Sequence, residues 1–177
     1  MANQSEAVAH AALVGGGQTT LHSHAAGGGE SEVVLITTAD VPNSTSTFAN
    51  VTDLTFTMLA NKTYIIEAWL IFQSNTAGTG IKFALNGPSS PAAVAMLAHV
   101  PIALTLYASC VTLASRAYDT GTPSVSVDTI NANLLCKIDG VVRNGNTQGT
   151  LAIRFAAETT GIVKIMTGSV LRYRLVN

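Results

Sequence analysis

The chain has 177 residues, of which 11% are charged, with 9 Lys and Arg against 10 Asp and Glu and a formal net charge of −1. Its mean hydropathy is +0.37. Soluble domains usually carry about 25% charged residues, so we expect this chain to bury part of its surface against copies of itself. The chain is nearly neutral and lacks the clustered cations that bind nucleic-acid phosphates, so we do not expect a nucleic-acid partner.

The first segment, residues 1–32, is predicted to be an extended Gly-rich N-terminal arm. An alanine-rich patch at 7–14 precedes GGGQTTLHSHAAGGG, in which two glycine triplets flank His22 and His24. Glycine triplets cost much backbone entropy to order, so we expect the arm to become ordered only against another molecule. Fully extended, some 30 residues reach on the order of 100 Å, which suits an attachment role.

Within the arm, His22 and His24 form a candidate metal site. In an extended chain, alternate side chains share one face, which places these two imidazoles about 6 to 7 Å apart. Three arms around a three-fold axis would offer six imidazoles, a set suited to a transition metal ion such as Fe or Ni, with Zn also a candidate. The alternative is two exposed histidines in a linker or in a surface that docks into a partner.

The remaining residues, 33–177, are predicted to form strands. Residues 33–37 are β-branched and apolar, and 53–58 alternate between apolar and polar side chains, as a half-buried strand does. Residues 63–74 form a long strand with two mostly apolar faces. One face carries Tyr64, Ile66, Ala68, Leu70 and Phe72, and the other carries Ile65, Glu67, Trp69 and Ile71. We therefore expect this strand to be central and covered on both faces.

An uncharged stretch follows, because residues 83–115 contain no Asp, Glu, Lys or Arg. Residues 92–114 are long enough to span a bilayer as a helix. However, Pro101 lies near the centre, His99 would be placed in hydrocarbon, and the flanks lack the Lys/Arg asymmetry that orients a span. We expect no membrane span and instead predict buried strands and a loop at a subunit interface.

Further strands are predicted by apolar runs between turn signals. These runs are residues 81–85, 124–128, 129–142, 150–158 and 163–175. Eight or more strands with turns roughly every ten residues predict an all-β fold, a jelly-roll β-sandwich head over residues 33–177. Cys110 and Cys136 lie in apolar runs and are expected to be buried thiols, with a single bridge between them as the alternative.

One loop is a candidate binding site, because aromatic side chains that bind glycans are more plausible in loops than in strands. Its residues are Tyr118, Asp119 and Thr120, and an ordinary turn is the alternative.

Catalytic motifs are not recognisable in the chain. It has no G-x-S-x-G, no Walker loop and no G-x-G-x-x-G, and a pair of His99 with Cys110 lacks an orienting third residue. The carboxylates are scattered one per predicted strand, so their spacing supports no glycosidase pair. They are Glu67, Asp128, Asp139 and Glu158. We therefore expect a protein that is not an enzyme and has no catalytic residues.

Two segments carry a resemblance to known proteins. LTFTMLANKTYIIEAWLIFQSNTAGTGIKFALNGP, with the closing GTLAIRFAAETTGIVKIMTGSVLRYRLV, resembles the jelly-roll heads of tailed-bacteriophage virion proteins. Those heads are similar in strand pattern to the trimeric heads of tumour necrosis factor and complement C1q. GGGQTTLHSHAAGGG resembles phage fibre and decoration segments with an H-x-H pair near a three-fold axis, although fibres commonly repeat the pair and this chain has it once.

The resemblance implies a homotrimeric structural protein of the virion, assembled in the host bacterial cytoplasm. It would decorate the capsid or form a head fibre, and residues 1–32 would attach it to the major capsid protein or another virion protein. In that trimer, outer loops such as 118–122 would face solvent. The alternative is a tail-fibre tip or receptor-binding module that recognises a host surface glycan. A cytokine-like or C1q-like soluble ligand is a third class, for which we would expect an export signal.

Overall fold

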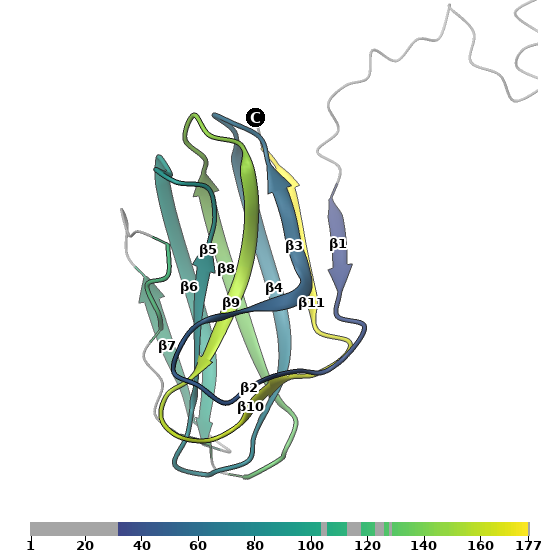
Figure 1. The fold of residues 1–177 in the computed structure, drawn as a ribbon, viewed down its shortest axis with the longest axis vertical. Coiled ribbons are helices and arrows are strands. Elements are labelled where there is room, and N and C mark those ends of the chain that lie inside the picture. The colour runs from purple at the N-terminus through teal and green to yellow at the C-terminus, as the bar shows by residue number, and fades with distance from the viewer. Residues whose placement is uncertain (1–31, 104–105, 113–117, 123–125, 128, 177) are drawn as a thin grey trace, which may run out of the picture. The chain divides into compact units, whose positions relative to one another are not determined.

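In a computed structural model, the described residues are 32–103, 106–112, 118–122, 126–127 and 129–176 (Figure 1). For residues 101–103 and 106–112 only the backbone is described. The chain divides after Ser31, and the unit beginning at Glu32 carries all of these residues. The arm predicted at 1–32, with the histidine pair, lies outside them except for Glu32.

The described part of the chain is all-β, as predicted. Its strands are β1 (Val33–Ile36), β2 (Val41–Asn43), β3 (Ala49–Met58), β4 (Thr63–Ser74), β5 (Ile81–Asn86), β6 (Ala93–Ala103), β7 (Leu106–Thr112), β8 (Leu134–Arg143), β9 (Gly149–Ala157), β10 (Val163–Ile165) and β11 (Val170–Leu175).

These strands form two antiparallel sheets. The larger sheet has the order β1-β11-β4-β8-β6-β7, with β10 pairing both β4 and β2, and the smaller sheet has the order β3-β9-β5. In Figure 1 the smaller sheet lies in front of the larger one, and the chain crosses between them from β4 to β5 and from β8 to β9. This arrangement confirms the predicted β-sandwich.

The core lies between the two sheets. The predicted inner face of β4 is confirmed, because Tyr64, Ile66, Leu70 and Phe72 are each at most 3% exposed. Phe72 meets Phe83 of the smaller sheet edge to face, with ring centroids 6.3 Å apart. Burying each such side chain contributes on the order of 1.5–3 kcal/mol, so this alternation is a main source of the fold's stability.

The other face of β4 differs from the prediction. The strand is central, with β11 and β10 on one side and β8 on the other. However, Ile65, Trp69 and Ile71 are only partly buried, so the described residues do not cover this face. The expectation of cover on both faces was wrong for the single chain, because an apolar pattern does not say whether the cover comes from the same chain or from another.

The predicted strand 163–175 is two strands, β10 and β11, separated by a turn. Gly168 has φ +82°, a conformation that favours glycine. In the turn, the Ser169 hydroxyl accepts a hydrogen bond from the backbone N–H of Ile71, at 3.0 Å, where no ladder partner from either strand is aligned. The turn therefore supplies a hydrogen bond to β4 at the point between its pairing with β10 and its pairing with β11.

Two other boundaries differ from the predictions. The predicted strand 129–142 begins at Leu134, because Asn131 adopts φ 54° in a preceding turn. The predicted strand 53–58 begins at Ala49, and a bulge at Asp53 (φ 72°) interrupts its pairing with β9. The Thr38 hydroxyl and backbone N–H donate to the Asp53 carboxylate at 2.6 and 3.0 Å, which lowers the pKa of Asp53.

Candidate interaction surface

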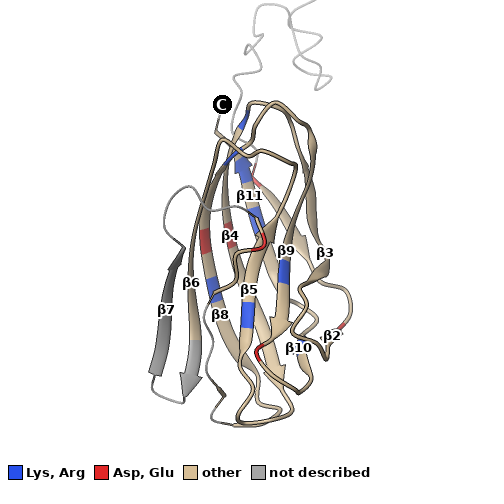
Figure 2. Ribbon diagram, turned by 60° about the vertical axis from the view of Figure 1, so that its left-hand side comes forward, with Lys and Arg blue, Asp and Glu red and all other residues tan. Residues whose placement is uncertain are grey.

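The larger sheet has an outer face, which we define as the side of β1, β11, β4, β8 and β6 that points away from the smaller sheet. Strand register places its side chains in rows that cross β11, β4 and β8. The rows are Arg174–Ile65–Val141, Arg172–Glu67–Asp139 and Val170–Trp69–Lys137. Figure 2 shows charged positions of these three strands lying side by side at mid-height.

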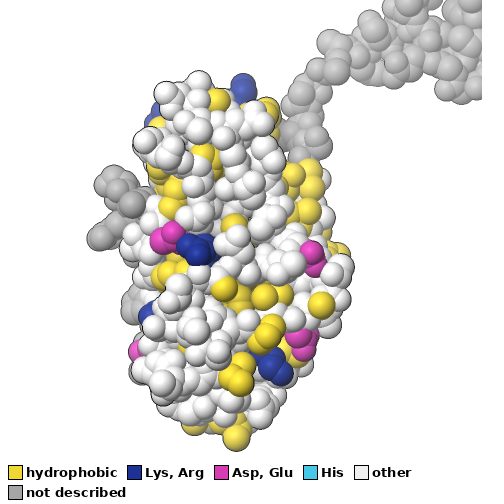
Figure 3. All heavy atoms as spheres, viewed as in Figure 1, with side chains coloured by type: hydrophobic (Ala, Val, Ile, Leu, Met, Phe, Trp, Pro, Cys, Tyr) yellow, Lys and Arg dark blue, Asp and Glu magenta, His cyan; other side chains and the backbone are white. Residues whose placement is uncertain are grey.

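Apolar side chains of the outer face are exposed. Ile36 and Val34 of β1 are 53% and 47% exposed, and Leu135 and Val141 of β8 are 50% and 44% exposed. Single exposed hydrophobic residues are ordinary, but several on one sheet face make that face a candidate interaction surface. Figure 3 shows the opposite side of the sandwich, where charged side chains are few and groups of opposite sign lie next to each other.

Trp69 lies at the middle of the outer face between two cations. Lys137 Nζ is 5.9 Å from the indole centroid, and Arg172 Cζ is 5.2 Å from it. Because the two cations come from β8 and β11, on either side of β4, they hold the ring from both flanks. Each contact contributes about 0.5–1 kcal/mol at an exposed site, which is enough to favour one ring orientation.

The charges of the outer face are only partly paired. Lys137 contacts Asp139 at 3.0 Å, and Arg172 contacts Glu32 at 3.5 Å. Glu67 lies in register between Asp139 and Arg172, yet no ion pair or hydrogen bond of its carboxylate occurs with the described residues. Like charges directly opposite across strands destabilise a sheet. Glu67 therefore has a like charge on one side, at Asp139, and the cation Arg172 on the other, without a direct ion pair to either.

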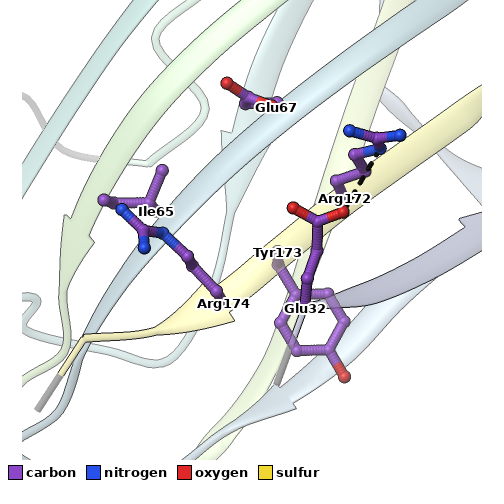
Figure 4. Close-up of a pocket in the computed structure, with 6 residues that line it drawn as sticks. All are labelled: Glu32, Ile65, Glu67, Arg172, Tyr173 and Arg174. Carbon is purple, nitrogen blue, oxygen red and sulfur yellow. Dashed lines mark ion pairs between the residues drawn. The ribbon is translucent and has the colours of Figure 1, made fainter. Parts of the chain in front are cut away.

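A shallow pocket of about 240 Å³ lies on the outer face beside this row (Figure 4). It is lined by Glu32, Ile65, Glu67, Arg172, Tyr173 and Arg174. Figure 4 shows Arg174 reaching back toward Ile65 while the Glu32–Arg172 ion pair borders the pocket. Tyr173 anchors this part of β11 to the core, because its ring stacks on Phe56 with centroids 3.6 Å apart. The mixed charges suit a polar or charged group of a protein partner.

The predicted loop residues Tyr118, Asp119 and Thr120 lie along the edge of the smaller sheet. The backbone N–H of Asp119 donates to Leu85 of β5 at 2.8 Å, and the same segment bonds β5 again at Thr122. The segment thus runs beside β5 like an additional strand. The expectation that residues 118–122 face solvent holds only in part, because Asp119 is exposed, Tyr118, Thr120 and Gly121 are partly buried, and Thr122 is buried.

The side chains of this segment are largely engaged within the head. Asp119 Oδ1 contacts Arg154 Nη1 at 2.6 Å, and Asn86 donates to Asp119 Oδ2 at 2.8 Å. The Tyr118 ring packs beside Gly87, and its buried hydroxyl has no hydrogen-bond partner among the described residues. Burial raises the pKa of Tyr118 to about 12. The binding role predicted for these residues stays a prediction.

The other predicted site residues fall in different places. His22 and His24 lie outside the described residues, and within those residues no group of three or more His, Cys, Asp or Glu side chains is placed to hold a metal ion. His99 lies on the outer face of β6, opposite Lys137 in register. Cys136 is buried in β8, whereas the side chain of Cys110 is not described.

Two features of the surface were missed from the sequence. Glu67 and Asp139 are scattered along the chain but are direct neighbours across β4 and β8. Lys137 lies opposite Trp69 in the same register and contacts Asp139. The strand pattern identifies which side chains share a face of one strand, but pairing between distant strands has no local signal, so this cluster could not have been found from spacing.

In the uncharged stretch, the prediction of buried strands is confirmed for β6. Its inner residues are at most 4% exposed in the chain's own core; they are Val94, Met96, Ala98 and Val100. The described residues contain no helix of the length and apolarity that crossing a bilayer requires.

Comparison with known proteins gives little. No protein-family model and no curated protein matches the chain. Among solved structures, the chain is similar to a chain in the structure of infectious bursal disease virus, Gt strain, at 9% sequence identity and a TM-score of 0.25. The match covers 84% of this chain, which spans 42% of the length of the viral one. A viral structure is thus among those that match, but a likeness this low carries no argument about function.

Proposed function

We propose that the chain is a structural protein of a bacteriophage virion. In this proposal it is a homotrimer that decorates the capsid or forms a head fibre, and residues 1–32 attach it to the capsid protein or another virion protein. The observation that carries the proposal is the outer face, an exposed apolar sheet surface in a chain with only 11% charged residues. Proteins with such surfaces bury them in assemblies.

The phage assignment is supported by the resemblance of the head and of GGGQTTLHSHAAGGG to phage virion proteins. The role would be mechanical and adhesive, without chemistry. The head supplies a rigid body built from long antiparallel strands, and the arm orders against the shell. If three arms meet at an axis, His22 and His24 would supply imidazoles to a transition metal that links them.

A second candidate is a tail-fibre tip that binds a host surface glycan. It is favoured by a pocket of about 520 Å³ in loops that follow β2 and β9. Five of its six lining residues carry hydroxyls; the six are Ser44, Thr45, Ser46, Glu158, Thr159 and Thr160. Such a lining can exchange hydrogen bonds with sugar hydroxyls, and a buried oxygen of Glu158 has no partner among the described residues.

The composition of purified virions tests the proposal. A decoration protein is expected in many copies on the head, and a tail-fibre tip in only a few copies on the tail, which quantitative mass spectrometry of separated heads and tails distinguishes. Absence of the chain from both fractions would contradict the proposal. Deletion of residues 1–32 should leave assembled heads that no longer join particles, whereas loss of assembly would assign the arm a different role.

The metal is tested separately. Elemental analysis of the full-length protein should find a transition metal that is lost in the double variant His22→Ala, His24→Ala. Absence of such a metal from the wild-type protein would end that part of the proposal.

A further inference from the structure

We infer that the outer face is the surface through which each head binds a second copy of the chain, and that cations at the margin of one face pair with the central carboxylates Glu67 and Asp139 of the next copy. The inference rests on the proposed self-assembly. It deepens that proposal by naming the surface and the charged groups that would set how the copies dock.

Apolar side chains of the outer face are left partly uncovered. β4 is the central strand of the larger sheet, and its outer side chains Ile65, Trp69 and Ile71 are only partly buried although its inner ones are fully buried. Leu135 and Val141 of the neighbouring β8 extend the apolar surface. A central strand with an uncovered apolar face is typical of a sheet that is covered in an assembly.

Charges of opposite sign occupy different parts of the outer face. Glu67 and Asp139 lie together near the middle of the face and are partly buried. Exposed cations lie toward its margins, with Arg143 at the end of β8 and Lys164 on β10 opposite Gln73. A second copy displaced across the face would therefore place marginal cations over central carboxylates. A partner of uniform charge would leave one of the two sets uncompensated.

The charge pattern also restricts the symmetry of the contact between two copies. A two-fold contact whose axis runs along β4 would bring Glu67 of one copy against Glu67 of the other, which like-charge repulsion opposes. A contact displaced from Glu67 is either a reciprocal two-fold contact between different residues or a heterologous contact, and heterologous contacts close into rings when the rotation permits. The charge pattern therefore disfavours a dimer centred on Glu67 and is compatible with the cyclic assembly that the proposed trimer requires.

Other occupants fit this surface less well. A glycan would be expected to stack on an aromatic ring, but the flanks of Trp69 are held by Lys137 and Arg172. A lipid surface of anionic headgroups would be repelled by the carboxylates at the middle of the face. A second copy satisfies both signs of charge and the apolar side chains together.

The test compares two substitutions at equally exposed leucine and isoleucine side chains in the full-length protein. Leu135 is 50% exposed on the outer face, and Ile130 is 52% exposed in a turn before β8. Sedimentation velocity should show that Leu135→Glu is monomeric while Ile130→Glu assembles like the wild type. Val141→Glu provides a second outer-face variant, and circular dichroism checks that each variant is folded.

The charged contact has its own variants. Glu67→Lys should weaken association by about tenfold or more, since it places a cation against a cation. Lys82→Glu, a charge reversal on β5 of the other sheet, should leave association unchanged. Equal effects of the two reversals would overturn the role of the central carboxylates.

Several outcomes would overturn the inference. These are a wild-type protein that stays monomeric, folded outer-face variants that assemble normally, and capture of anionic vesicles or glycans by a monomeric wild type but not by Leu135→Glu. Failure of this inference is distinguishable from failure of the proposed function. If the chain is found on virions while Leu135→Glu still assembles, only the inference fails; if Leu135→Glu is monomeric but the chain is absent from virions, only the virion assignment fails.

Discussion

Replacement of Ser169 by alanine should destabilise the head by removing a hydrogen bond that the sheet itself does not supply. Ser169 is 0% exposed, and its hydroxyl accepts from the Ile71 N–H at 3.0 Å and donates to the Met166 carbonyl at 2.8 Å. In Ser169→Ala the Met166 carbonyl keeps a bond from the Thr37 hydroxyl, at 2.9 Å. The Ile71 N–H is left without a partner.

The expected loss of stability follows from this one buried N–H group that is left without a hydrogen-bond partner. An unpaired buried N–H costs about 1–3 kcal/mol, and for a chain of this size each kcal/mol lowers Tm by roughly 2–4 °C. The free energy of unfolding, measured by urea titration, should therefore fall by about 2 kcal/mol. Ser89→Ala, at an exposed position, is the matched control and should change stability by less than about 0.5 kcal/mol.

All variants must be compared at one protein concentration, because association adds to apparent stability. If Ser169→Ala is as stable as Ser89→Ala, the hydroxyl does not complete the hydrogen bonding of β4, and the account of the turn between β10 and β11 is refuted.

Three further predictions concern local packing. Tyr118→Phe should keep or raise the free energy of unfolding, by up to about 1 kcal/mol, because it removes a buried hydroxyl without a partner; clear destabilisation in urea would contradict this. Because burial raises the pKa of Tyr118 to about 12, the phenol ionises first in the unfolded chain, so the free energy of unfolding should be unaffected by this ionisation below pH 10 and should fall between pH 10 and about 12. An absorbance titration should show the Tyr118 phenol ionising late, and difference spectra of Tyr118→Phe should separate it from Tyr173, whose pKa burial also raises. Gly145→Ala should cost about 1–3 kcal/mol, because the added Cβ overlaps the carbonyl oxygen of Ser90, whereas Gly78→Ala, with open space around it, should be neutral in the same urea titration.

The strand pattern predicted those parts of the fold in which the alternation of apolar and polar side chains decides the structure. The inner face of β4 was identified residue by residue, because period-two burial leaves a direct mark on the sequence. The division between β10 and β11 was not predicted. It depends on Gly168 and on a hydroxyl that bonds a strand nearly a hundred residues away, and neither is visible in apolar periodicity.

The candidate surface was predicted only in part. The outer side chains of β4 were recognised as apolar and expected to be covered, but the pattern did not say whether the cover comes from the same chain or from another. The row that joins Arg172, Glu67 and Asp139 depends on register between strands that are distant in sequence. The loop at 118–122 was identified as a loop, while its pairing with the edge of β5 is a tertiary contact that composition does not reveal.

Trp69 permits the most direct measurement, since it is the only tryptophan of the chain and lies at the middle of the outer face. Acrylamide quenching of its fluorescence should be strong in the monomeric Leu135→Glu variant and weak in the assembled wild-type protein, with emission shifted to shorter wavelength on assembly. Equal quenching in the two proteins, with the wild type shown to be assembled in the same sample, would mean that the copies meet through a different surface.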